Sequence, residues 1–395
     1  MKVLMLTHEY PPDSIGGIAT FCHELANVLP ECGVDLTVAA GSNTINVPTI
    51  QNHNGSSHLI RLSKVNLPPT HLWYQLMNLG TLGRLIERFD IVQAQDSSAF
   101  PLLYLAKKKH PHIPWVVTIH SGPVSELYYA LASLKDGGSL IEFARYGIGF
   151  PSWDVILRAD IKFADEVVPV SHNLFLEIQK RYGLDSERAS IIHTGIDVEK
   201  VMKMARTSVS GNTSNKVMLF WAGRFSWRKG IVHLLNSLEY LAHDIGFTNF
   251  EIQLFGRGPL ERKVRELTSH LKLTENIRFR GFVRYEEVIS AMASSDIVCF
   301  PSLYEACPVG MIEAMALGKP LVVFDRPFSR EMLGEIELGP AEDIRGYAKA
   351  LYSLCNSDEL RKQVGASLRA RARQFDIKTI AENYVRVYQK ILARQ

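Results

Sequence analysis

Short apolar runs alternate with longer amphipathic stretches along almost the whole chain. In the first half the apolar runs predict strands at Val3–Thr7, Asp35–Ala39, His58–Leu62, Ile91–Ala94, Trp115–Ile119 and Glu166–Val170. In the second half they predict strands at Val217–Ala222, Glu251–Phe255, Ile277–Arg280, Ile297–Phe300 and Pro320–Phe324. Because strands that alternate with helices form parallel sheets covered by helices, the pattern predicts an α/β fold with two doubly wound, Rossmann-like domains.

A polar stretch from Thr207 to Asn215 interrupts this alternation, and its composition is typical of a flexible surface segment. We therefore predict an N-terminal domain at residues 1–190 and a C-terminal domain at residues 191–375. The last amphipathic run, from Ile377 to Ala393, predicts a helix within a closing segment at residues 376–395.

Composition leaves this globular prediction unchanged. The 395 residues are 46% hydrophobic and 22% charged, and a net charge of +3 is too small to indicate a nucleic-acid partner. The five cysteines show no CxxC spacing, which favours free thiols in a reducing compartment over zinc or disulfides. No apolar run reaches the roughly 20 residues that a membrane span needs, and the apolar core of Met1–Thr7 is too short for a signal peptide. We expect a cytoplasmic protein, with any membrane contact peripheral.

The most informative stretch follows the predicted strand Ile297–Phe300 and enters an amphipathic helix at Pro308. Glu305 falls in the loop and Glu313 on the second turn of the helix, on the order of 10 Å apart. That separation is too large for two carboxyl groups to share a proton. The helix amides of Val309 and Gly310 lie between them and favour an anionic group. A nucleotide sugar, with hydroxyl groups at both ends and phosphates between, fits this pattern.

Two acidic residues separated by seven others, after a strand that ends in Pro-Ser, resemble the signature of the retaining family 4 glycosyltransferases. The resemblance covers nearly the whole chain. It implies the GT-B fold, in which two Rossmann-like domains face each other across a cleft and the C-terminal helix crosses back to the first domain. It also implies that Glu305 contacts the donor sugar and Glu313 the ribose. The alternative interpretation, which suits any isolated pair of glutamates, is that Glu305 is a solvated loop residue and Glu313 an exposed charge on the helix.

Two loops of the first half add weaker signals. Gly16 and Gly17 precede an amphipathic helix, where glycines allow backbone N–H groups to approach a phosphate, although Gly-Gly also simply makes tight turns. His120 follows the apolar strand Trp115–Ile119, at the edge where open α/β sheets bind ligands; the alternative is a histidine bonded only to its own loop. The resemblance implies that the glycines belong to the donor-facing loop and that His120 contacts the donor sugar. It also implies that the aromatic-rich region between residues 121 and 165 faces the acceptor, although core packing explains most of such residues.

In the second half, Arg224 and Lys229 follow the strand Val217–Ala222. The resemblance implies that they hold the donor's two phosphates, Arg224 as a planar fork and Lys229 as a point charge. It further implies that the backbone around Val283 cradles the nucleotide base. One departure bears on specificity: Ala306-Cys307-Pro308 stands where many relatives have Gly-Phe-Gly, and Pro308 has no N–H to offer a sugar hydroxyl. The identity of the donor sugar therefore stays open.

The sequence thus predicts a retaining glycosyltransferase that moves a sugar from a nucleoside diphosphate donor to a hydroxyl of a glycan, lipid-linked or small-molecule acceptor. Neither a metal nor another cofactor is expected, because cations and helix amides are available for the phosphates and the chain contains no Asp-x-Asp motif. Two alternatives remain, a nucleotide-sugar epimerase of the same fold and a non-catalytic nucleotide-sugar binding module.

Overall fold

The computed structural model of the protein describes residues 1–13, 16–43, 49–53, 57–65, 70–96, 98–135, 140–206, 215–335, 341 and 343–394. Contacts within the chain divide it into two compact units. The first unit consists of Met1–Leu127, Ala144–Gly195 and Asp376–Gln395, and the second of Tyr128–Phe143 and Ile196–Phe375. Most of the polar stretch expected to be flexible, residues 207–214, lies outside the described residues.

The break between the units falls after Gly195 rather than after residue 190. Residues just beyond 190 stay with the first unit because they continue beside its last strand, where the amide of Ile192 donates to the carbonyl of Pro169 at 3.2 Å. Ile196 already belongs to the second unit, and its amide donates to the carbonyl of Phe375 at 3.0 Å. The sequence pattern did not indicate that Tyr128–Phe143 groups with the second unit.

The first unit is built on a seven-stranded sheet of order β3-β4-β2-β1-β5-β6-β7, parallel except for β3. Its strands are β1 Lys2–Thr7, β2 Asp35–Ser42, β3 Thr49–His53, β4 Ser57–Ser63, β5 Ile91–Gln95, β6 Trp115–Ile119 and β7 Glu166–Pro169. Its helices are α1 Gly17–Val28, α2 Thr70–Leu85, α3 Leu102–Lys109, α6 His172–Tyr182 and α15 Ile377–Leu392, with parts of α4 Pro123–Lys135 and α5 Leu140–Phe163. The edge strand β3 was not predicted.

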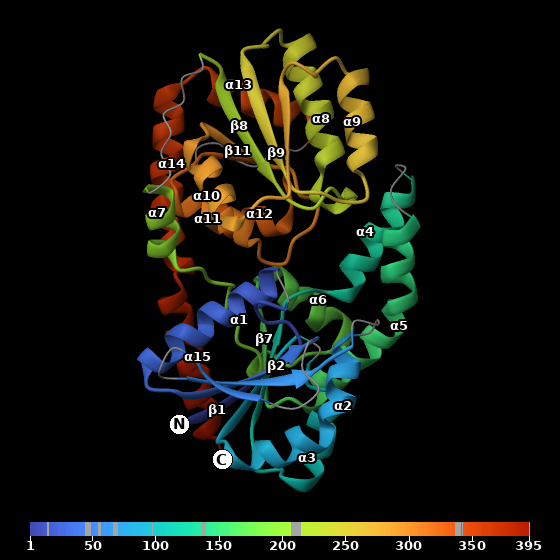
Figure 1. Cartoon of the computed structure of the whole chain (residues 1–395), viewed down its shortest axis with the longest axis vertical. Coiled ribbons are helices and arrows are strands. Elements are labelled where there is room, and N and C mark those ends of the chain that lie inside the picture. Colours follow the sequence, from blue (N-terminus) through green and yellow to red (C-terminus); the bar gives the residue numbers. More distant parts are fainter. Residues whose placement is uncertain are drawn as a thin grey trace. The chain divides into compact units, whose positions relative to one another are not determined.

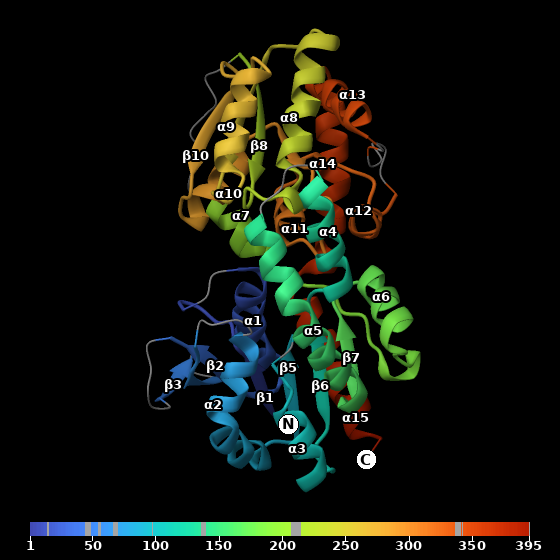
Figure 2. The same cartoon turned by 90° about the vertical axis from the view of Figure 1, so that its right-hand side faces the viewer.

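The two faces of this sheet follow from the alternation of side chains along its strands. Val3 and Met5 of β1 pack into one apolar cluster with residues of α1 and α15, so the C-terminal helix covers the first unit's sheet, as predicted. Asp376 caps α15 by accepting from the amide of Lys378. Figure 2 shows α6 beside β7 at the edge of the same sheet.

The second unit has a five-stranded, wholly parallel sheet of order β10-β9-β8-β11-β12. Its strands are β8 Val217–Ala222, β9 Phe250–Phe255, β10 Ile277–Gly281, β11 Ile297–Phe300 and β12 Leu321–Val323. Its helices are α7 Val198–Arg206, α8 Ile231–Glu239, α9 Glu261–His270, α10 Tyr285–Ser294, α11 Val309–Ala316, α12 Pro327–Leu333, α13 Ile344–Cys355 and α14 Asp358–Ala372.

Helices cover both faces of this second sheet. Leu219 and Trp221 of β8 belong to the cluster formed with α8, α9 and α13, whereas Phe220 between them belongs to the cluster formed with α10, α11 and α14. Figure 1 shows α8 and α9 on one side of β8 and β9, with α10 and α11 on the other. The predicted class, two doubly wound α/β domains, is confirmed. No helix in the described ranges is both long and apolar enough to cross a membrane.

Candidate functional site

Four loops leave the carboxyl ends of adjacent strands in the second unit. We call them the β8 loop, residues 223–230; the β9 loop, residues 256–260; the β10 loop, residues 281–284; and the β11 loop, residues 301–308. They occupy the edge at which open α/β sheets bind their ligands. The β8, β10 and β11 loops contain residues that the sequence pattern singled out.

Main-chain hydrogen bonds join these loops. The amide of Phe225 in the β8 loop donates to the carbonyl of Arg257 in the β9 loop at 3.0 Å. The amide of Gly256 in turn donates to Gly281 of the β10 loop at 2.7 Å. Gly256 has φ +117°, and a Cβ there would lie 2.0 Å from the carbonyl oxygen of Gly223, so only glycine allows the two backbones to approach so closely.

The β8 loop is also fitted against the β11 loop. Gly230 has φ +65°, and a Cβ on it would lie 1.8 Å from the carbonyl oxygen of Pro301. The amide of Leu303 donates to the carbonyl of Arg228 at 2.8 Å. The residue between them, Lys229, is therefore held by backbone packing on both sides.

Lys229 and Glu305 form an ion pair between these two loops, with 2.5 Å between Nζ and Oε1. Glu305 is 9% exposed, and burial alone would raise the pKa of its carboxyl group. The charges of Lys229 and Arg228, with hydrogen bonds from Lys229 and Ser302, outweigh burial and lower the pKa of Glu305 below its usual value. Glu305 is thus a buried, ionised carboxylate rather than a solvated loop residue.

Glu313 lies on the second turn of α11 and is only 6% exposed. Its Oε1 accepts a hydrogen bond of 2.6 Å from the hydroxyl of Tyr285, the first residue of α10. Burial raises the pKa of Glu313, and the Tyr285 hydroxyl opposes part of that increase. The alternative reading of Glu313 as an exposed helix charge is therefore wrong.

The first turn of α11 connects the two glutamates. Pro308 is its N-cap residue, and the amide of Met311 is the first to bond back to the Pro308 carbonyl. The N–H groups of Val309 and Gly310 precede that first bond and have no intrahelical acceptor. A Cβ placed on Gly310 would lie 3.9 Å from Oε2 of Glu313, so this carboxylate oxygen is near the same turn.

Arg224 is exposed in the β8 loop, and within the described ranges its guanidinium makes no ion pair. The side chain of Lys229 passes the preceding residue, Gly223, where a Cβ would lie 3.8 Å from Cδ of Lys229. Val283 in the β10 loop is half-buried against the α10 and α11 side of the sheet. Phe282, its neighbour, is 73% exposed.

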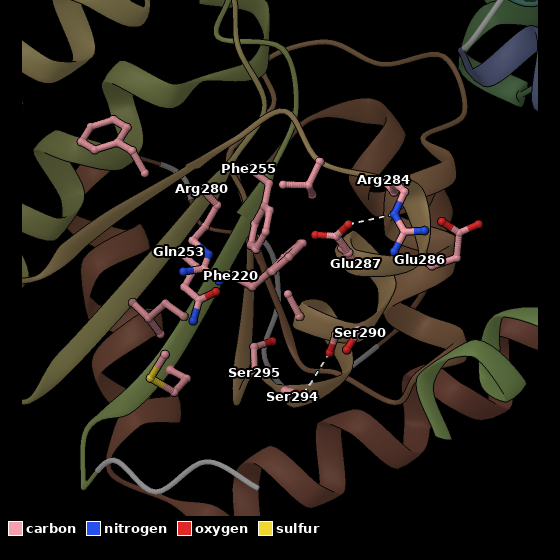
Figure 3. A pocket seen from close by; sticks show the side chains of 15 residues that line it. Phe220, Gln253, Phe255, Arg280, Arg284, Glu286, Glu287, Ser290, Ser294 and Ser295 are labelled. Carbon is pink, nitrogen blue, oxygen red and sulfur yellow. Dashed lines mark hydrogen bonds and ion pairs between the residues drawn. The ribbon is translucent and has the colours of Figure 1, made fainter. Parts of the chain in front are cut away.

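A cavity of about 610 Å³ lies on that side of the sheet. Figure 3 shows Gln253 and Arg280 on the strands, the rings of Phe220 and Phe255, and Glu286 and Glu287 on α10. Val283 is the one predicted site residue among those that line the cavity, so the cavity begins at the β10 loop and extends away from Lys229 and Glu305.

In the first unit, Gly16 is the N-cap of α1 and Gly17 its first residue. Both are exposed, neither has a left-handed φ, and a Cβ on either would meet no atom within 4 Å. A tight turn therefore does not require glycine at these two positions. The structure thus leaves open space beside the backbone at both glycines.

His120 follows β6, and its Nε2 lies 2.8 Å from Oε1 of Gln95 on the neighbouring strand β5. Its amide donates to Asp96, and its ring packs edge-on against Phe21 at 5.4 Å between centroids. Its side chain is thus held by a neighbouring strand as well as by α1. Burial lowers the pKa of His120 to about 3, so the imidazole is neutral near pH 7.

Two family models match the chain in succession. The model described as Glycosyltransferase Family 4 matches residues 15–200, and the model described as Glycosyl transferases group 1 matches residues 205–371. The chain belongs to glycosyltransferase family 4. An uncharacterized glycosyltransferase of Methanocaldococcus jannaschii is 26% identical to it over 340 residues, which cover 82% of this chain and 80% of that protein.

Solved structures share the fold of this glycosyltransferase. The sucrose-phosphate synthase of Thermosynechococcus elongatus matches with a TM-score of 0.76 at 18% identity, over 100% of both chains. The HepE protein of Anabaena in complex with UDP and glucose matches with a TM-score of 0.72 at 17% identity, over 99% of this chain and 100% of that one. At such identities the likeness shows the fold alone, and it agrees with the two Rossmann-like domains described above.

The second unit of this family 4 glycosyltransferase thus contains a connected set of predicted residues. Lys229 contacts Glu305 directly, and Glu313 lies one turn beyond the amides of Val309 and Gly310. Gly16, Gly17 and His120 belong to the first unit. Within the described ranges, no group of three or more His, Cys, Asp or Glu side chains is placed to hold a metal ion.

Several polar residues at these sheet edges were not identified from the sequence. In the first unit, His8 follows β1, where its Nδ1 lies 2.7 Å from Oγ of Ser98 and its carbonyl accepts from Lys64 at 2.9 Å. In the second unit, Tyr285 bonds Glu313 and Arg257 protrudes from the β9 loop. The sequence signal for His8 is the one that found His120, a polar residue directly after an apolar strand; Tyr285 has no comparable signal.

Proposed function

We propose that this protein is a retaining glycosyltransferase that transfers a sugar from a nucleoside diphosphate sugar to a hydroxyl group of a glycan, lipid-linked or small-molecule acceptor. The observation that carries the proposal is the Lys229–Glu305 pair, fixed beside the first turn of α11 with Glu313 one turn further on. Such an arrangement offers acceptors for hydroxyl groups at both ends and donors for phosphate oxygens between them. The HepE protein, which shares the fold, was solved with UDP and glucose, and this supports a donor of that class.

The diphosphate leaving group is the main electrostatic problem of the reaction. At about 4 Å and an effective dielectric constant near 20, one cation contributes roughly 4 kcal/mol against one phosphate charge. Lys229 uses one ammonium hydrogen for Glu305 and has two others to donate, and Arg224 adds a planar fork of donors. These two cations and the α11 amides are the groups that we assign to the developing charge.

Glu305 is assigned to the donor sugar and Glu313 to the ribose. Because Lys229 keeps Glu305 ionised, Glu305 accepts hydrogen bonds from sugar hydroxyls and does not supply a proton. We propose a front-face reaction in which the departing phosphate takes the acceptor proton; attack by Glu305 as a nucleophile is the less favoured variant because its charge is already engaged by Lys229. His120, neutral in its site, is assigned a hydrogen bond to the donor sugar.

The test is incubation of the purified protein with nucleoside diphosphate sugars and candidate acceptors. We expect nucleoside diphosphate to be released only with an acceptor, the anomeric configuration of the donor to be retained in the product by NMR, and turnover to persist in excess chelator. Conversion of the donor without acceptor would instead indicate an epimerase. Donor binding without release under any condition would indicate a binding module, and inhibition by chelator that magnesium reverses would contradict the metal-independent part of the proposal.

A further inference from the structure

The hydrogen bond between Tyr285 and Glu313 links two elements of the second unit that both border the proposed nucleotide site. Tyr285 begins α10 directly after the β10 loop, and Glu313 lies on α11. The bond of 2.6 Å joins residues 28 positions apart. It therefore connects the start of α10, directly after the loop that the family resemblance places at the base, with the carboxylate assigned to the ribose.

Tyr285 points away from the cavity of Figure 3 although its neighbours line it. Glu286 and Glu287 belong to that cavity, whereas Tyr285 does not line it and reaches Glu313 instead. Successive helical residues project in directions about 100° apart, since one turn takes 3.6 residues. The first position of α10 is thus the one that turns toward α11, and a tyrosine there is long enough to reach it.

Few other groups of the described residues interact with the Glu313 carboxylate. It is 6% exposed, and within the described ranges no cation forms an ion pair with it; Lys229, the cation of the β8 loop that is held in place, is paired with Glu305. An ionised carboxylate can accept about four hydrogen bonds, two on each oxygen. Tyr285 takes one of these on Oε1 and leaves Oε2, near Gly310 and the first turn of α11, free for further donors.

We propose that Tyr285 is a positioning residue for the donor nucleotide: its hydroxyl fixes the Glu313 carboxylate in the orientation that accepts the ribose hydroxyls. The proposal rests on the proposed function, which assigns Glu313 to the ribose. The direction of the pKa shift of Glu313 agrees with this role of Tyr285. Burial raises the pKa of Glu313 and the Tyr285 hydrogen bond lowers it again, so that loss of the hydroxyl favours the protonated form, which is a poorer acceptor.

The experiment measures binding by calorimetry from pH 5 to pH 8, using whichever of UDP, GDP and ADP binds the wild type most tightly and the 2′,3′-dideoxy form of the same nucleotide. Tyr285→Phe removes the hydroxyl and keeps the ring. We expect it to bind the ribonucleotide about 5- to 10-fold more weakly at pH 7, as for loss of one hydrogen bond. We also expect a smaller preference for ribose over dideoxyribose, and a loss of affinity on acidification that begins at higher pH than in the wild type.

Tyr352→Phe is the matched control, because Tyr352 lies on α13 of the same unit and is as exposed as Tyr285, at 41%. It should behave like the wild type. If Tyr285→Phe keeps the wild-type ribose preference and pH dependence, Tyr285 is only a surface residue and the inference is overturned. The variant Glu313→Ala distinguishes failure of this inference from failure of the proposed function. If Glu313→Ala binds the nucleotide as tightly as the wild type, the assignment of Glu313 to the ribose is wrong. If Glu313→Ala binds more weakly while Tyr285→Phe binds normally, only the role of Tyr285 is wrong.

Discussion

Two cations in one loop have different surroundings, and this difference decides what can be expected of each. Lys229 is paired with Glu305 and fitted between backbones, whereas Arg224 is exposed on the same loop. Because charge on the diphosphate grows as the glycosidic bond breaks, either cation should stabilise the transition state more than the bound donor.

Replacing Arg224 or Lys229 by alanine should lower kcat by about 10²- to 10³-fold, by analogy with removal of one oxyanion donor, with a smaller loss of donor affinity. Arg224→Lys should recover part of the loss, because the charge returns without the two-pronged geometry. Steady-state kinetics with the donor varied would measure both effects. Arg262→Ala, at a side chain that is 92% exposed on α9, is the control and should leave kcat unchanged. A higher KM with intact kcat in Arg224→Ala would mean that Arg224 supplies only uniform binding.

His120 should contribute no ionisation to the activity profile near neutral pH. Its pKa is lowered to about 3 by burial, so it is neutral at every pH above about 5 and charges only below that range. Replacing His120 by alanine should reduce kcat but leave the shape of the profile between pH 6 and pH 8 as in the wild type. An acidic limb in this range that disappears in His120→Ala would show that the imidazole titrates during turnover.

Residues that directly follow a recognisable strand could be singled out from the sequence, whereas contacts that depend on side-chain direction could not. Glu305, Glu313 and Lys229 stand at fixed distances from apolar strands, and the structure gives each a buried or fitted position. Tyr285 meets Glu313 only because of the angle at which α10 leaves the β10 loop, which no local pattern encodes. Pairing of Lys229 with Glu305 likewise joins two loops that are far apart in sequence and that pack together at Gly230 and Pro301.

At the scale of elements, the β8 loop depends on a glycine. Gly230 combines a left-handed φ of +65° with a Cβ position 1.8 Å from the carbonyl oxygen of Pro301. Gly230→Ala should therefore displace the loop against the β11 loop, with a loss of stability above the roughly 1–3 kcal/mol of left-handed strain alone and a marked fall in kcat.

Gly246→Ala provides the comparison, because Gly246 also has a left-handed φ, +80°, but a Cβ there would meet no atom within 4 Å. Denaturant unfolding should show a smaller loss of stability in this variant, and its kcat should be unchanged. Equal losses in the two variants would mean that backbone strain, and not contact with Pro301, accounts for Gly230.

The strands were predictable because they are buried. The central strands of both sheets pack apolar side chains on two faces and read as continuous apolar runs in the sequence. The edge strand β3, Thr49–His53, has the sequence Thr-Ile-Gln-Asn-His and pairs antiparallel with β4 alone. With a single large apolar residue it carries too little hydrophobic signal to be separated from a loop.

At the scale of the whole molecule, one buried acid should make stability depend on pH in an unusual direction. Asp160 on α5 is fully buried in the first unit, and burial raises its pKa well above the usual value. A carboxyl group whose pKa is raised on folding contributes stability that is fully present below its unfolded pKa and is lost as the pH rises toward its folded pKa. The thermal midpoint should therefore fall from pH 4 to pH 7 more steeply in the wild type than in Asp160→Asn.

Asp154 on the same helix supplies a control of opposite sign. Burial opposes its ionisation, but Arg181 and Tyr182, at 2.7 and 2.6 Å from its carboxylate, outweigh burial and lower its pKa. Its contribution is present at neutral pH and lost only as the pH falls below about 4. In calorimetric scans, the thermal midpoint of Asp154→Asn should thus change between pH 4 and pH 7 with the same slope as that of the wild type. If the thermal midpoint of Asp160→Asn also followed the wild-type slope, the prediction for Asp160 would be wrong.

The sequence did not predict that Tyr128–Phe143 groups with the second unit. The ring of Tyr129 stacks on Tyr304, next to Glu305, with 5.3 Å between ring centroids. The sequence placed these aromatic residues in the first half of the chain, where core packing was the favoured interpretation and the family resemblance implied that they face the acceptor. Assignment to a unit follows from long-range contacts, which the alternation of strands and helices does not specify.

The main-chain bonds among the β8, β9, β10 and β11 loops also bear on how donor preference could diverge or be engineered. Because backbone amides and carbonyls make these bonds, most side-chain substitutions should leave this network of main-chain bonds, here called the frame, intact. Replacement of Gly230 or Gly256, or an insertion beside either, should break it. Variation is then confined to side chains that protrude from the frame, among which Arg257, Phe282 and Tyr285 are exposed. We expect a library restricted to Arg257 and Phe282 to vary the side chains offered to a nucleotide while retaining the folded loops, the Tyr285–Glu313 hydrogen bond and the Lys229–Glu305 pair.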